Sequence, residues 1–138
     1  MEYSQDNIKA IEFLYRRVDI EDVVSAHERA IEAAKDLRFD KFIITATTPF
    51  SKDDCRDLLR DAPAVLRSYV PEFERVFTAK GWTMFPSLSR VYVNDRARKK
   101  LGWEPKYNFE DVLERVSAGK GVLSDVAAVV GIKGYHRS

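Results

Sequence analysis

Apolar residues early in the chain recur every three or four positions and predict an amphipathic helix over residues 20–37. Asp19 is well placed as its N-cap, and the acidic pair that follows suits the positive end of the helix dipole. Before it, residues 4–12 fit a frayed helix and residues 13–18 a short extended segment. The shared face of the long helix consists of Val23, Ala26, Ala30, Ala33, Ala34 and Leu37.

Two short runs have the character of strands. Residues 41–47 read KFIITAT, a β-branched and mostly apolar run that is typical of a strand buried on both faces. Residues 89–93 alternate between polar and apolar positions and predict a second strand. Pro, Gly, Ser and Asn residues stand between the remaining apolar segments at positions typical of helix starts and ends, and they predict further helices. These are a helix from Ser51 to Arg60, helices over 63–69 and 71–80, one from Asn94 to Leu101, one after Asn108, and one from Ser124 to Gly131.

This order of elements predicts a helix-rich α/β fold in a single domain, residues 1–138. The sheet would have two or three short strands and no complete Rossmann domain. Because so small a sheet is marginal alone, we expect packed helices or another chain to cover it.

Composition narrows the functional classes. The 138 residues carry 23 Lys and Arg against 22 Asp and Glu, a net charge of +1 that argues against a polyanion-binding arm. One cysteine excludes an intrachain disulfide framework, and with two histidines a Cys/His zinc site is not expected. No apolar run could span a bilayer or form a signal peptide. We therefore expect a cytoplasmic protein without nucleic-acid or membrane partners.

The usual motifs of cofactor chemistry are missing from the sequence. No glycine-rich dinucleotide fingerprint follows a predicted strand, and no P-loop occurs. None of the six tyrosines has a lysine four residues later. The sequence therefore predicts no catalytic residue, no metal ligand and no cofactor bound by this chain.

A few single residues and one basic run could take part in catalysis or binding, but for each of them a purely structural role is the simpler interpretation. His27 lies near the apolar face of the long helix, where packing on or beside the core is the simpler role. Cys55 reads as a small core-facing residue, because no basic group is placed to activate it. His136 falls in the tail, where we expect exposure. The basic run of residues 95–100 fits the solvated face of a short helix, with Ala97 and Leu101 inward, better than a nucleic-acid contact.

Arg90 and Tyr92 are the candidate substrate-binding residues. Alternation in the predicted strand places both on one side, with Val91 and Val93 on the other. Arginine forks onto phosphate oxygens, and a tyrosine beside it could bind a sugar hydroxyl. The equally good alternative is a cross-strand pair on the surface.

Two stretches together resemble the C-terminal, substrate-side half of the extended short-chain dehydrogenase/reductase family, the NAD(P)-dependent nucleotide-sugar epimerases and dehydratases. Residues 17–27 read RVDIEDVVSAH, an extended stretch and acidic pair that open a helix. Residues 93–105 read VNDRARKKLGWEP and are similar to the family's signature ending in Leu-Gly-Trp-x-Pro. The resemblance covers residues 15–117, and residues 118–138 would add a C-terminal helix and tail.

The resemblance implies a lobe that helps to hold a nucleotide-sugar over a Rossmann domain. The family's glycine fingerprint and catalytic Tyr-x-x-x-Lys pair precede the stretch seen here, so NAD(P) is implied only for the complete fold. The family's diphosphate-binding Arg stands further before the Asp of the second motif than Arg90 stands before Asp95, and near that spacing Phe85 is found.

Two hypotheses follow for function. In the first, the chain is a truncated substrate-side lobe that binds a nucleotide-sugar or related small molecule and is inactive alone, with a Rossmann-half partner supplying the cofactor. In the second, it is a non-catalytic interaction module that forms a homodimer, because a lost domain would leave an apolar surface exposed.

Overall fold

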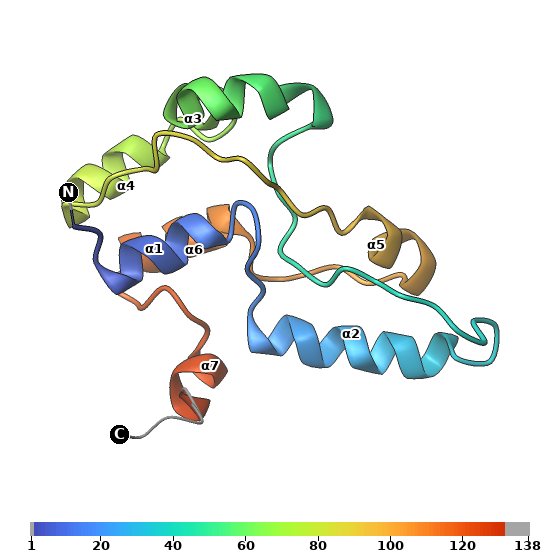
Figure 1. Ribbon diagram of the computed structural model, residues 1–138. Helices are drawn as coiled ribbons and strands as arrows, with labels where there is room; N and C mark the ends of the chain where they lie inside the picture. The colour runs from blue at the N-terminus through green and yellow to red at the C-terminus, as the bar shows by residue number, and fades with distance from the viewer. Residues whose placement is uncertain (1, 132–138) are drawn as a thin grey trace, which may run out of the picture.

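The computed structural model describes residues 2–131 and is helical throughout, apart from the connecting segments (Figure 1). Seven α-helices and one short 3-10 helix occur in this range. The elements are α1 (Gln5–Glu12), α2 (Ile20–Ala33), η1 (Lys52–Asp54), α3 (Cys55–Tyr69), α4 (Phe73–Lys80), α5 (Asp95–Leu101), α6 (Phe109–Ser117) and α7 (Asp125–Val130).

The helices form two packed groups. In the larger group, α6 packs against α1 and α4, and α4 also contacts α3. Its core is aromatic and aliphatic, with Phe13, Phe77 and Phe109 almost fully buried. In the smaller group, α2 packs against α5 and α7. Trp103, which is 1% exposed, fills the contact between α2 and α5.

The capping residues read from the sequence mark several helix starts correctly. The Asp19 side chain accepts a hydrogen bond from the Glu21 N–H at 3.0 Å and caps α2. Ser124 caps α7 in the same way, and Asn108 forms a capping box at α6. Ala97 and Leu101 are buried as predicted. The helix predicted over residues 20–37 ends earlier, at Ala33, and continues only as a turn.

The predicted α/β fold is wrong, because residues 2–131 contain no strand and no sheet. Residues 41–47 and 89–93 are extended but form isolated contacts with the turn that follows α1. The Ala46 N–H donates to the Arg17 carbonyl at 2.8 Å, and the Tyr92 N–H donates to the Tyr15 carbonyl at 2.8 Å. These bonds are too few to make a ladder.

Part of the reason lies in the segment between α1 and α2, for which the sequence predicts a short extended stretch over residues 13–18. Residues 13–17 are not extended but coil around the end of α1. Their peptide N–H groups donate back to Ala10, Ile11 and Glu12 and are no longer free to pair with a strand. Side chains occupy the other edge of residues 41–47, where Asn94 donates to the Thr45 carbonyl at 2.8 Å. The apolar residues Phe42 and Ile44 pack against the smaller helical group instead.

Candidate functional site

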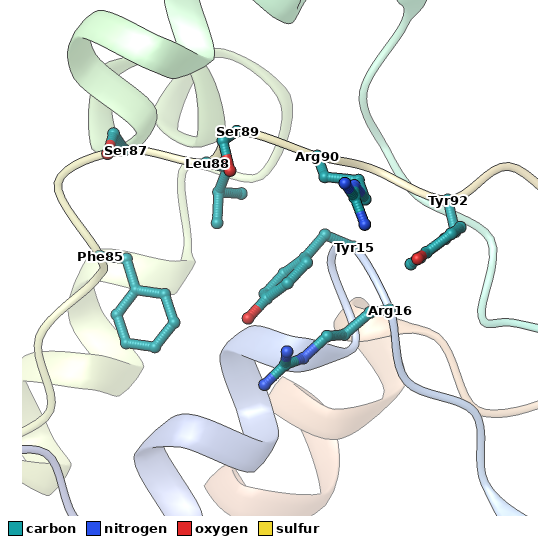
Figure 2. A pocket seen from close by; sticks show the side chains of 8 residues that line it. All are labelled: Tyr15, Arg16, Phe85, Ser87, Leu88, Ser89, Arg90 and Tyr92. Carbon is teal, nitrogen blue, oxygen red and sulfur yellow. The ribbon is translucent and has the colours of Figure 1, made fainter.

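Arg90 and Tyr92 line a surface cavity of about 520 Å³ (Figure 2). Both are exposed, and both belong to the extended segment that joins α4 to α5. The opposite wall comes from the turn after α1, which contributes Tyr15 and Arg16. The other lining residues are Phe85, Ser87, Leu88 and Ser89.

The two walls of the cavity are joined directly. The Tyr92 N–H donates to the Tyr15 carbonyl at 2.8 Å, which fixes the spacing of the two segments at one end. Figure 2 shows the Tyr15 ring between the side chains of Arg90 and Arg16, with Tyr92 beyond Arg90. Phe85 lies at the other end of the cavity. Residues about 75 positions apart in the chain thus face one another.

A kink in α3 anchors the wall formed by residues 85–90. Asp61 has φ −154° and ψ 78°, values outside the helical region, just before Pro63. At this break the Ala62 N–H donates to the Pro86 carbonyl at 3.0 Å, and Leu58 accepts from the Leu88 N–H at 2.9 Å. The helix therefore holds the cavity segment through its own peptide groups.

Arg16 is held in place by Glu12. Its Nε and one terminal nitrogen donate to Glu12 Oε1 at 3.0 and 2.5 Å, and Arg17 donates to Oε2 at 2.6 Å. The hydrogen bond to Glu12 raises the pKa of Arg16 above its ordinary value, so the guanidinium stays charged. Its carbon lies 5.2 Å from the centre of the Tyr15 ring, a cation–π distance.

Tyr15 is partly buried, and Arg90 is left without a protein partner. Burial raises the pKa of Tyr15, although the neighbouring Arg16 opposes the shift. The phenol is therefore neutral near pH 7 and can donate a hydrogen bond. Within residues 2–131, the Arg90 guanidinium makes no ion pair and no hydrogen bond. A ligand anion could bind it without displacing a protein carboxylate.

The sequence identified only part of this cavity. Arg90 and Tyr92 were found from their alternation, although the strand that it predicted does not form. The sequence pattern does not indicate Tyr15 and Arg16, because it predicts only a short extended segment over residues 13–18. Phe85 lies near the position at which the family resemblance would place the diphosphate-binding arginine, and it lines the cavity.

The other candidates lie away from the cavity. His27 is exposed on α2, and its Nδ1 lies 2.8 Å from the Val23 carbonyl oxygen, so the prediction that it packs with the core is wrong. Cys55 is also exposed, contrary to its predicted inward position. His27 lies on the outward face of α2, and Cys55 is the first residue of α3. His136 lies outside the described residues.

The basic run on α5 is largely engaged with carboxylates. Arg96 pairs with Asp40, to which Lys100 adds a contact at 3.5 Å. Arg98 pairs with Asp95 at 2.6 Å. Three of the four basic side chains of α5 therefore form ion pairs within the protein.

Residues 2–131 hold no group of three or more His, Cys, Asp or Glu side chains arranged to bind a metal ion. A helix long and apolar enough to cross a bilayer is likewise absent from that range. Comparisons with protein-family models, with curated proteins and with solved structures found no match to this chain.

Proposed function

We propose that this chain is a substrate-side lobe that binds a nucleotide-sugar, or a related phosphorylated small molecule, in the cavity between Arg90 and Tyr15. The proposal extends to a role in catalysis that depends on a partner chain. In that role the lobe orients the substrate, and a dinucleotide-binding partner supplies the redox cofactor.

The chemistry of the cavity lining carries this proposal. Two guanidinium groups, two phenols and two serine hydroxyls face the same space, and no carboxylate is among the lining residues. Guanidinium groups bind phosphate oxygens in a forked geometry, and hydroxyl groups can both donate to and accept from sugar hydroxyls. Such a lining favours an anionic, hydroxyl-rich ligand over an apolar or a cationic one.

Each side chain has a separate role in this proposal. Arg90, which has no protein partner, binds a phosphate, and Arg16 on the opposite wall adds a second positive charge. Tyr15 and Tyr92 offer ring faces and hydroxyl groups to the sugar or the base. Phe85 supplies the apolar surface at the far end.

The two stretches that carry the family resemblance also contact each other, which supports treating them as one unit. The Trp103 Nε1 donates to the Asp22 carbonyl at 3.2 Å and to Ser25 Oγ at 3.0 Å. The Asp22 carboxylate accepts from the N–H groups of Lys106 and Tyr107 at 2.8 and 3.0 Å. Gly102, at φ 60°, adopts the left-handed conformation that ends α5 and turns Trp103 inward.

Calorimetric titration of the purified chain with UDP-glucose tests the proposal. We expect micromolar binding that falls at least tenfold in Arg90→Ala, because the variant loses a charged hydrogen-bond donor to phosphate. Arg56→Ala is the matched control, since Arg56 is an exposed arginine outside the cavity lining. UDP and glucose are titrated separately, to show whether the phosphates or the sugar dominate.

Two results would count against the proposal. If neither UDP-glucose nor UDP binds at millimolar concentration, nucleotide-sugars are excluded as ligands of the cavity. Equal binding by Arg90→Ala and Arg56→Ala would place the site elsewhere. NADH is titrated in parallel, and we expect no binding to the single chain because its sequence lacks the glycine fingerprint.

A further inference from the structure

The outward face of α2 carries a stripe of apolar side chains that no described part of the chain covers. Ile20, Val24 and Ile31 are 38%, 53% and 75% exposed. With His27 they are spaced by four, three and four residues, which is the spacing of a helix seam that packs against another helix. A solvated helix of a monomer would normally carry polar residues at these positions.

The neighbouring helix α7 extends this apolar surface. Val126, Val129 and Val130 of α7 are exposed, and α7 packs against α2. Ile20 and Val130 line the same hollow, so the two sets of side chains are adjacent. We call this surface the α2–α7 face. Within residues 2–131 twelve large apolar side chains are exposed, and six of them lie on it, namely Ile20, Val24, Ile31, Val126, Val129 and Val130.

The stripe on α2 is complementary to itself. Its spacing of four, three and four reads the same in both directions along the helix. A two-fold axis through the middle of α2 therefore brings Ile20 of one copy against Ile31 of the other, and Val24 against His27. A two-fold interface of this kind uses the same patch on both subunits and closes at two copies.

The acidic first turn of α2 does not enter the stripe. Asp22 is 1% exposed, and its carboxylate accepts from the Lys106 and Tyr107 N–H groups on the opposite side of the helix. Glu21 accepts from the Tyr107 hydroxyl. The net charge of +1 adds little general repulsion between copies.

We infer that the α2–α7 face is a homodimer interface, occupied by the same face of a second copy. The cavity stays open in such a dimer, because none of its lining residues belongs to α2 or α7. The inference therefore does not depend on the function proposed for the cavity. One pair of helices buries less than the roughly 1,600 Å² of a standard interface, so the dimer should dissociate on dilution.

Sedimentation velocity of the full chain over a hundredfold range of concentration tests the inference. We expect the mass to rise from the 15.9 kDa of one chain to twice that value. Val24→Glu and Ile31→Glu should each hold the protein at the monomer mass at the highest concentration, because each buries a charge in the seam. Leu59→Glu is the matched control, since Leu59 is 56% exposed on α3 and should dimerise like the parent.

Circular dichroism of each variant checks that the helices are intact; since both stripe positions are exposed, we expect unchanged spectra. A parent chain that stays monomeric throughout would overturn the inference. So would a dimer that both stripe variants retain, or one that Leu59→Glu alone disrupts. Growth beyond two copies would also contradict it, because a two-fold interface does not propagate.

Discussion

Ala62 donates its peptide N–H to the carbonyl oxygen of Pro86 at 3.0 Å, across the kink in α3. Leu88 completes the pair by donating to the Leu58 carbonyl at 2.9 Å. The two bonds bracket the break in the helix and attach it to the segment that carries Arg90. The kink thus acts as a positioning element for one wall of the cavity.

Asp61 stabilises this kink by capping the second half of α3. Its Oδ1 accepts from the Ala64 N–H at 3.1 Å. We expect Asp61→Ala to lower the free energy of unfolding by about 1 kcal/mol, the typical cost of losing such a cap. Chemical denaturation measures the loss, and hydrogen exchange at the Leu88 amide should become faster. Asp36→Ala removes an exposed carboxylate outside α3 and should change neither quantity.

Asp22 connects α2 to the chain that follows α5. Each of its carboxylate oxygens accepts one backbone N–H, from Lys106 and from Tyr107. In Asp22→Asn one acceptor becomes an N–H₂ group that faces a backbone donor in a site only 1% exposed. We expect a loss of about 1–3 kcal/mol in the free energy of unfolding, measured by urea denaturation at pH 7. Asp36→Asn is the control, and equal stability of the two variants would contradict the connecting role.

Tyr107 donates its hydroxyl proton to Glu21 at 2.5 Å. This hydrogen bond raises the pKa of Tyr107 to about 12. The folded state therefore keeps a proton that the unfolded state loses near pH 10, and this stabilisation disappears as the pH rises from about 10 to about 12. In a phenolate absorbance titration, the step near pH 12 should be absent from Tyr107→Phe.

Glu21→Gln tests the cause of that shift. The variant keeps an oxygen acceptor but removes the negative charge, so the pKa of Tyr107 should move toward its ordinary value. The late absorbance step should then occur at lower pH while the other tyrosines titrate as before. An unchanged late step would show that burial of the ring, and not Glu21, controls the proton.

Helix ends could be read from the sequence because they depend on neighbours in the chain. Asp19 and Ser124 cap helices where the sequence places them, since each side chain accepts from a peptide N–H two or three residues away. Asn108 also begins its helix where the sequence places it, with its N–H donating to the Asp111 carboxylate three residues on. The sheet was mispredicted because strand pairing depends on a distant partner. The turn after α1 uses its N–H groups locally, which single-sequence periodicity does not reveal.

The sequence pattern predicts one wall of the cavity and not the other. Arg90 and Tyr92 share one wall because they are two residues apart in an extended segment, and extended backbone alternates sides whether or not it pairs. Tyr15 and Arg16 reach the other wall only because α1 ends in a coiled turn. Nothing in their local pattern indicates that contact.

Glu12 controls the charge of the cavity through Arg16. Its carboxylate spans Arg16 and Arg17 and neutralises part of the positive charge that a phosphate would meet. We expect Glu12→Gln to bind UDP-glucose severalfold more tightly at low ionic strength, because glutamine retains a carbonyl acceptor for Arg16 and loses the charge. Titration at low salt and near 1 M salt measures this, and the gain should shrink as the screening length falls to about 3 Å. Glu72→Gln, on an exposed carboxylate outside the lining, should bind like the parent. Weaker binding by Glu12→Gln would mean that Glu12 contributes by holding Arg16 in place and that its charge matters less.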